Sequence, residues 1–216
     1  IASVVNGYRS YDFGKEYEII YVESYCDGSK WKKLFKALKG YLEFAKVLKK
    51  EKPDLVHVHS SFGPSFYRKM PFIYMAYRKK LPIVNHIHGA EFDTFYLNAT
   101  DKKKSIIRKV YQRCDRLIAL SEEWKERLKM IVPEEKITVL TNYCTIPADL
   151  PEKRKNQMLF LGEIGQRKGG FDIPSILAAS HLQENHIRFI FAGDGQAEDV
   201  ARIKNEIKEK GLDEWV

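Results

Sequence analysis

The chain has 216 residues, of which 44% are hydrophobic, so it can bury a core as one large domain or two small ones. It contains no run of about 18 apolar residues, which argues against a membrane-spanning helix within this sequence. The formal net charge of +8 is uneven, because residues 1–142 carry 27 basic and 17 acidic side chains whereas residues 143–216 carry 10 and 12. A basic first part attracts partners that carry phosphate, namely nucleotides, nucleic acids or anionic lipids.

The three cysteines, Cys26, Cys114 and Cys144, are widely spaced and form no CxxC motif. This pattern is typical of reduced thiols in the cytosol and not of a disulfide framework. We therefore expect a cytoplasmic protein.

The first 50 residues contain two helical patterns around a β-rich run. Residues 1–13 have apolar positions near helical spacing, and residues 17–22 (YEIIYV) have the composition of a strand. Residues 31–50 predict an amphipathic helix, whose apolar face should pack inward. Its lysine-rich outer face is either a solvated surface or a surface that rests on an anionic membrane. The apolar positions are Trp31, Leu34, Phe35, Leu38, Leu42, Ala45 and Leu48.

The rest of the first part alternates short apolar strands with helices. Parallel strands need helical crossovers, so this alternation predicts an α/β fold with a doubly wound parallel sheet. Ligands of such sheets bind beyond the carboxyl ends of the strands. The expected strands are 55–59, 83–88, 117–120 and 137–140, and the expected helices are 65–80, 103–113 and 122–131.

The texture changes after residue 142. Residues 143–156 contain two prolines and several charges without periodicity, which indicates a linker between a first domain at 1–142 and a second at 157–216. In the second domain we expect strands at 158–161 and 187–192, a helix that begins near Asp172 with Pro174 in its first turn, and a helix at 197–210. We expect this to be the start of a second βαβ unit, whose sheet the sequence does not complete.

Two strands end in an HxH motif, with His57 and His59 in the first and His86 and His88 in the second. Side chains alternate along a strand, so each pair lies on one face. Four histidines could ligate zinc, although such a site needs three or four ligands and supporting carboxylates. The alternative is that the last histidine of each pair serves a ligand at the strand's carboxyl end, and that the earlier one is packed.

Three further candidates follow the strands. Glu91 and Asp93 come soon after His88, but they share one loop and do not face each other as a glycosidase pair would. Ser121 lacks the GxSxG context of a nucleophile, and we expect it to cap the following helix, whose first turn holds Glu122.

The stretch FLGEIGQRKGGFD has the order of a phosphate site. A strand ends at Gly162, Arg167 and Lys168 lie in the loop, and a helix begins near Asp172. Backbone N–H groups and cations in such a turn bind phosphate, although the stretch is neither a P-loop nor GxGxxG. On spacing alone, an inert turn with surface cations is an equal alternative.

Five motifs keep their order along nearly all of the chain: PDLVHVHSS, HIHGAEFDTFY, DRLIALSEEWKERL with ITVLTNYC, LFLGEIGQRKGGFD and FIFAGDGQ. They resemble the family 4 retaining glycosyltransferases of the GT-B fold, especially those of bacterial polysaccharide synthesis. The resemblance implies two Rossmann-like parallel-sheet domains, both incomplete here. The family's first strand is expected before Ile1 and its donor-sugar carboxylate motif beyond Val216, so we expect this piece to be inactive alone.

By resemblance, the enzyme is a hexosyltransferase-type protein that moves a sugar from a nucleotide donor to a glycan or lipid-linked acceptor with retention of configuration. His88 matches the family's active-site histidine, and Gly162 and Lys168 match the donor diphosphate site. Residues Gly193, Asp194 and Gly195 match a loop beside the nucleotide, and Glu91 and Asp93 become acceptor-side candidates. No metal ion or other cofactor is implied.

One position departs from the family pattern. Glu163 stands where an arginine commonly contacts the diphosphate, so either Glu163 points away or Arg167 substitutes for the missing cation. We expect substitution.

Two rival functions come from other classes. A basic nucleic-acid-binding module would use the aromatic and basic residues of 65–80, but their helical spacing favours packing on the sheet. A zinc hydrolase would use the HxH strands. The preferred interpretation has a nucleotide sugar, a glycan or lipid-linked acceptor and an anionic membrane surface as partners, and no nucleic acid. It places the enzyme in the cytoplasm, peripheral at the inner membrane face.

Overall fold

The computed structural model describes residues 1–11, 13, 16–89, 91–143 and 156–216. Contacts divide the chain into two compact units, Ile1–Thr145 and Ile146–Val216, each with its own core. The predicted linker at 143–156, apart from its two end residues, lies outside the described residues, and so does Cys144. Of the other cysteines, Cys26 and Cys114 are free thiols.

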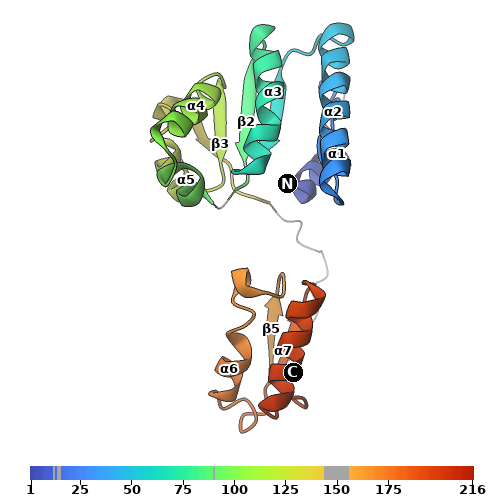
Figure 1. Ribbon diagram of the computed structural model, residues 1–216, viewed down its shortest axis with the longest axis vertical. Helices are drawn as coiled ribbons and strands as arrows, with labels where there is room; N and C mark the ends of the chain where they lie inside the picture. The colour runs from blue at the N-terminus through green and yellow to red at the C-terminus, as the bar shows by residue number, and fades with distance from the viewer. Residues whose placement is uncertain (12, 14–15, 90, 144–155) are drawn as a thin grey trace. The chain divides into compact units, whose positions relative to one another are not determined.

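The first unit is built on a four-stranded parallel sheet (Figure 1). Its strand order β1-β2-β3-β4 follows the chain, and a helix connects each strand to the next, which confirms the predicted parallel α/β arrangement. The strands are β1 (Val56–Ser60), β2 (Ile83–Ile87), β3 (Arg116–Ala119) and β4 (Ile137–Val139), and the connecting helices are α3 (Pro64–Arg78), α4 (Asp101–Tyr111) and α5 (Glu122–Leu128).

The core of the first unit lies between this sheet and its helices. Ile83 in β2 and Leu117 in β3 are fully buried, as expected for a parallel sheet covered on both faces. On α3, Phe66, Ile73 and Ala76 are also fully buried. The apolar face of the segment at 65–80 therefore packs in the core, as its helical spacing predicts, whereas Tyr67 and Tyr77 are exposed.

Local signals set the helix ends. The Ser121 hydroxyl accepts a hydrogen bond from the backbone N–H of Trp124 at 3.3 Å, so Ser121 caps α5 as predicted. Thr100 caps α4 in the same way. The sequence analysis missed the short elements, among them the π-helix η1 (Asp93–Leu97) and the 3-10 helix η2 (Glu134–Lys136), because each has too few residues for a periodic pattern.

Helix α2 (Lys30–Lys50) forms as predicted, but the prediction of its buried face was wrong. Of the predicted inward positions only Leu48 is buried, and the buried face consists of Ala37, Gly40, Phe44 and Leu48. The physical reason is close approach: a Cβ on Gly40 would lie 2.7 Å from the carbonyl oxygen of Glu23. No helix in the described ranges is long and apolar enough to cross a bilayer.

Residues 17–22, predicted as a strand, are not one. They run between α1 (Ala2–Ser10) and α2 and form no β-ladder with any described strand. A cavity of about 910 Å³ lies between residues 16–25 and residues 53–59, the segment that contains most of β1. The β-rich run thus lacks a neighbour within hydrogen-bonding distance, and composition alone cannot make a strand without one.

The second unit is smaller and more open. Strand β5 (Gln157–Leu161) pairs in parallel with β6 (Arg188–Ala192), and the connection between them contains η3 (Gln166–Lys168) and α6 (Ile173–Ala178). Helix α7 (Ala197–Glu209) follows β6 and packs against α6. The order of strand, helix, strand and helix agrees with the prediction. Its small core consists of Ile164, Leu177, Leu182, Phe189, Ile203, Ile207 and Leu212.

Candidate functional site

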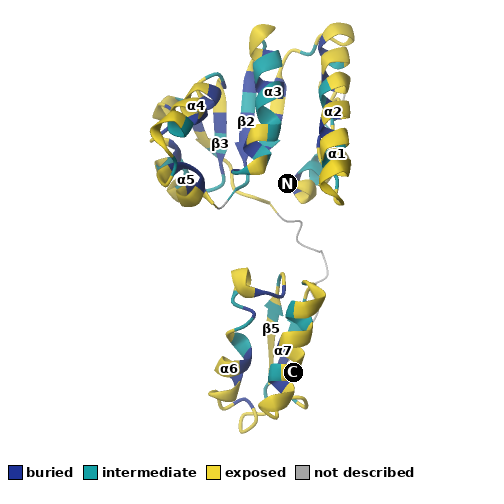
Figure 2. Ribbon diagram, in the orientation of Figure 1, coloured by how far each residue is buried: buried dark blue, intermediate teal, exposed yellow. Residues whose placement is uncertain are grey.

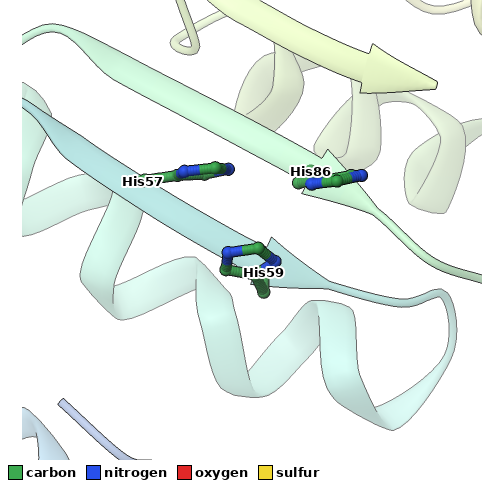
Figure 3. A group of neighbouring side chains, drawn as sticks. All are labelled: His57, His59 and His86. Carbon is green, nitrogen blue, oxygen red and sulfur yellow. The ribbon is translucent and has the colours of Figure 1, made fainter. Parts of the chain in front are cut away.

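The four HxH histidines come together on one face of the sheet in the first unit. The parallel register of β1 and β2 places His59 opposite His86. Nδ1 of His59 lies 3.0 Å from Nε2 of His88, and the ring centroids of His86 and His88 are 4.1 Å apart. Figure 3 shows His57, His59 and His86 standing on the two neighbouring strands. The structure therefore joins two motifs that are 29 residues apart into one stacked group.

Backbone contacts fix the position of His88. Its N–H donates to the carbonyl oxygen of Ser60 at 2.8 Å, which continues the β1–β2 pairing past the end of β2. At Gly89 an added Cβ would lie 2.8 Å from the backbone nitrogen of Phe62 and 2.7 Å from Oγ of Ser61. Only glycine permits this approach, so the HG pair sets where the imidazole stands at the carboxyl edge of the sheet.

The histidines of this group are neutral at neutral pH. Burial lowers the pKa of His59 to about 3, that of His88 to about 3 and that of His86 to about 4, and repulsion among the neighbouring imidazoles adds to each shift. Desolvation also lowers the pKa of His57. A neutral imidazole has one N–H and one acceptor nitrogen, so the contact between His59 and His88 is a hydrogen bond between two uncharged rings.

The most buried of these histidines has unmet hydrogen bonds. His86 is 2% exposed, and neither of its ring nitrogens has a hydrogen-bond partner among the described residues. Next to it, Ser60 Oγ donates to Oδ1 of the buried Asn85 at 2.7 Å. An unsatisfied buried polar group costs about 1–3 kcal/mol and is found where function requires it. The histidine group is therefore a candidate site and not only a packed core.

The same group contains three potential metal ligands. Ligand nitrogens of His57, His59 and His86 all lie within 4.8 Å of one another. However, the rings of His57 and His86 stack almost in parallel, at 10°, and no carboxylate in the described part of the chain joins the group. Metal-ligating histidines usually donate their second N–H to a carboxylate or carbonyl, which His86 does not do. The geometry suits a stacked array better than coordination.

The two carboxylates after His88 have different surroundings. Glu91 is exposed. Asp93 begins η1 and accepts a hydrogen bond from Nη1 of Arg127 at 2.8 Å, and Arg127 also contacts Glu123 on its own helix at 2.9 Å. Asp93 thus ties η1 to α5. Acceptor-side roles for Glu91 and Asp93 remain predictions.

In the second unit, the predicted glycine positions do meet. The N–H of Gly162 donates to the carbonyl of Ala192 at 3.1 Å, so the loops after β5 and β6 continue side by side. A Cβ on Gly193 would lie 1.8 Å from the carbonyl oxygen of Gly162, and one on Gly195 would lie 2.2 Å from that of Ile164. The two loops touch backbone to backbone, which only glycine allows.

The cations of this unit differ in their partners. Arg167 in η3 contacts Oε2 of Glu163 through Nη2 at 2.6 Å and Nε at 3.3 Å. The acidic residue at the unusual position is thus turned toward the arginine expected to replace the missing cation. Lys168 is exposed, and its ammonium group makes no hydrogen bond or ion pair with the residues that the structure describes. The sequence predicted both cations but not the pairing, although the i, i+4 spacing is its signal.

The sheet topology and these two sites define an α/β protein with a GT-B-like fold. Residues 7–143, more than half of the chain, match the family described as Glycosyltransferase Family 4. The chain belongs to this family. No curated protein sequence matches the chain significantly.

Two solved structures are similar in fold. Alr3699/HepE of Anabaena, solved in complex with UDP and glucose, aligns over 80% of this chain and 49% of its own, with a TM-score of 0.57 and 17% identity. UDP-N-acetylglucosamine 2-epimerase from Rickettsia bellii aligns over 97% of this chain and 57% of its own, with a TM-score of 0.51 and 17% identity. The chain thus spans about half the length of these two proteins.

Proposed function

We propose that this chain carries the acceptor-side domain and part of the nucleotide-sugar domain of a retaining, hexosyltransferase-type enzyme of cell-surface polysaccharide synthesis. The observation that carries the proposal is His88, held at the carboxyl end of β2 by backbone contacts and by His59, in a member of glycosyltransferase family 4. The reaction breaks the bond between the anomeric carbon and the donor diphosphate. It forms a bond from that carbon to an acceptor oxygen, whose proton is released.

In the first unit, His88 serves the donor sugar as a neutral ring. Its Nε2 contacts His59 Nδ1 at 3.0 Å, and no hydrogen bond joins its Nδ1 to another described residue. Burial, which lowers its pKa to about 3, keeps the ring uncharged at the reaction's pH. An uncharged ring contacts sugar hydroxyls near the reacting carbon without attracting the diphosphate away from its own site. No enzyme nucleophile is required.

In the second unit, Gly162, Lys168 and the loop at 193–195 bind the nucleoside diphosphate. The leaving diphosphate gains charge as the glycosidic bond breaks, so fixed N–H dipoles and cations stabilise the transition state more than the ground state. Lys168 offers an exposed ammonium group, and the glycine contacts keep side chains out of the two loops. Arg167 joins by exchanging its contact with Glu163 for one with the diphosphate.

The remaining parts of the proposal concern the acceptor and the location. Glu91 and Asp93 lie on the loop and π-helix that follow His88, where an acceptor hydroxyl can approach the first unit. The acceptor is a glycan or lipid-linked, and the excess of basic residues at 1–142 favours the cytoplasmic face of an anionic membrane. The enzyme uses no metal ion or other cofactor.

The decisive experiment uses the full-length enzyme and measures its donor binding by calorimetry, and its turnover, across a panel of sugar nucleotides. We expect Lys168→Ala to weaken donor binding about tenfold, because a charge-assisted contact to phosphate is lost. Lys204→Ala, which removes an exposed lysine of α7 in the same unit, is the matched control and should bind like the parent. His88→Ala should keep donor binding and lose turnover. If Lys168→Ala binds donor as well as the parent does, the diphosphate site is wrong.

A zinc hydrolase is the second candidate, because three histidine nitrogens lie within 4.8 Å of one another. Metal analysis of protein prepared without chelators separates the two functions. We expect substoichiometric zinc. One zinc per chain, lost together in His57→Asn and His86→Asn variants, would favour the hydrolase.

A further inference from the structure

Helix α2 has a second apolar face that no described residue of the first unit covers. This exposed stripe runs along the helix at i, i+3, i+4, i+7 and i+11, and Figure 2 shows how much of α2 is exposed at the edge of the unit. Such a row of large side chains on one helix is unusual for a surface exposed to water and marks an interaction site. The residues and their exposed fractions are Trp31 71%, Leu34 48%, Phe35 68%, Leu38 46% and Leu42 68%.

The stripe is not a loosely packed part of the core. Each residue of an α-helix turns by about 100°, so the centre of the stripe lies about 130° around the axis of α2 from the centre of the buried face. On the buried face Phe44 packs against Phe72 of α3, with ring centroids 5.2 Å apart. On the same side the Tyr41 hydroxyl donates to the carbonyl oxygen of Arg68 at 2.9 Å. The packing against α3 is therefore already made by other residues, and the stripe is available.

Lysines flank the stripe. Helix α2 contains eight lysines and one glutamate, and no charged residue interrupts the five stripe positions. Lys36 is held by Glu23 at 2.9 Å, on the side of the helix toward residues 16–25. Lys32, Lys39 and Lys46 have exposed side chains and no ion partner in the described ranges. Lysine stems can lie along an apolar surface while the ammonium groups reach outward.

Charge decides what covers the stripe. A second copy of this chain would bring the same lysines against each other, and a basic partner is repelled for the same reason. An anionic bilayer fits both the apolar stripe and the lysines beside it. Its headgroup region takes up Trp, Phe and Leu side chains, and its phosphates attract lysines. The combination of apolar residues on one face with flanking lysines is that of a helix lying in a membrane interface.

We infer that α2 docks the first unit on an anionic lipid bilayer, with Trp31, Phe35 and Leu42 buried at the boundary between headgroups and acyl chains. On this surface the proposed transferase meets a lipid-linked acceptor. Only this statement about the acceptor rests on the proposed function. Vesicle binding is measured without donor or acceptor. Its failure would leave the transferase assignment intact, and failure of the transferase assays would leave membrane docking intact.

The test is co-sedimentation with vesicles of phosphatidylcholine alone and of phosphatidylcholine mixed with phosphatidylglycerol. The parent should bind the mixed vesicles about tenfold or more tightly than the neutral ones. The double variant Trp31→Ser/Phe35→Ser should lose about tenfold or more of that binding, since two large apolar side chains no longer enter the bilayer. Leu97→Ser/Ile106→Ser removes exposed apolar residues elsewhere in the first unit and should bind as the parent does.

Two triple lysine variants test whether α2 is the helix that faces the membrane. Lys32→Gln/Lys39→Gln/Lys46→Gln should reduce binding to the mixed vesicles. Lys102→Gln/Lys104→Gln/Lys109→Gln removes the same number of charges from α4 and should reduce it less. Equal losses would mean that net charge and not α2 binds the membrane, which would overturn the inference. Thermal melting of each variant checks that it is folded.

Two other results would also overturn it. Equal binding of the parent to both vesicle types is one. The other is a parent dimer in sedimentation velocity that Trp31→Ser/Phe35→Ser converts to monomer while vesicle binding stays unchanged, because a second copy would then cover the stripe.

Discussion

The two units hold their candidate sites in opposite ways. In the first, His88 is fixed by a backbone hydrogen bond at 2.8 Å, by the ring of His59 and by the close approach at Gly89. In the second, Arg167 and Lys168 are exposed side chains in a short turn, and only the glycine loops beside them are rigidly packed. The difference suggests that the first unit presents a preformed group, whereas the second reorganises its cations when a ligand binds.

The largest effect is expected where the rigid part of the second unit is broken. Gly193→Ala places a Cβ 1.8 Å from the carbonyl oxygen of Gly162, so it should destabilise this unit by roughly 3 kcal/mol or more. Gly162→Ala is the matched control, because its Cβ would meet only the ring of Phe160, at 3.9 Å. Hydrogen exchange of β5 and β6 measures both. Similar protection in the two variants would contradict the backbone contact.

The second prediction is that acid lowers the stability of the first unit more than that of the second. An unfolded histidine protonates near pH 6.5, whereas burial lowers the pKa of His86 to about 4 in the folded state. The unfolded state then binds more protons below pH 6.5, so stability is full above that pH and falls as the pH drops toward 4. Between pH 7 and pH 5 His86 alone should remove about 2 kcal/mol from the first unit.

Denaturant titrations at several pH values check this. His86→Asn should flatten the decline in the first unit, even if it lowers stability at pH 7. The second unit has no buried histidine in its described part and should decline less over the same range. An unchanged slope in His86→Asn would mean that another group is responsible.

The third prediction tests how the preformed histidine is held. His59→Asn removes the ring that contacts Nε2 of His88 at 3.0 Å, so His88 should lose its orientation and its preferred tautomer. In the full-length enzyme we expect kcat to fall about tenfold with KM for the donor nearly unchanged, because the binding groups remain. His57→Asn is the control, since no hydrogen bond links His57 to His88 among the described residues. Equal losses in the two variants would show that stacking and not the hydrogen bond matters.

The smallest effect concerns the reorganising cation. Glu163→Gln removes the negative charge that holds Arg167 at 2.6 Å, so the guanidinium should reach the donor diphosphate at less cost. Exposed pairs contribute under about 1 kcal/mol, so donor affinity should rise about threefold. Glu198→Gln, at an exposed position at the start of α7, is the control. Weaker donor binding in Glu163→Gln would mean that Glu163 itself contacts the donor.

Sequence reasoning succeeded where a local pattern has one structural meaning. The alternation of strand and helix gave every described strand of both units, and Ser121 with the acidic residues after it gave a helix cap. His57 and His59 on one face, and His86 and His88 on one face, follow from the two-residue period of a strand. That the two pairs meet depends on the register of β1 against β2, which neither motif contains.

It failed where a pattern has two meanings. Helix α2 has an apolar stripe and a second face with Ala37, Gly40, Phe44 and Leu48, and the stripe with more large residues is the exposed one. Hydrophobicity ranks the stripe first, but packing favours the face where Gly40 lets the backbone of Glu23 approach. The run at 17–22 failed for a related reason, because strand composition requires a neighbouring strand that only the tertiary structure can supply.

The cavity beside β1 has a consequence for what the edge of the sheet can bind. Strand β1 stands at the end of the sheet, and its outer edge has no strand partner in the part of the chain that the structure describes. An unpaired edge next to a cavity of about 910 Å³ can pair with any extended chain that fits. An added peptide of alternating apolar and polar residues should therefore bind at this edge.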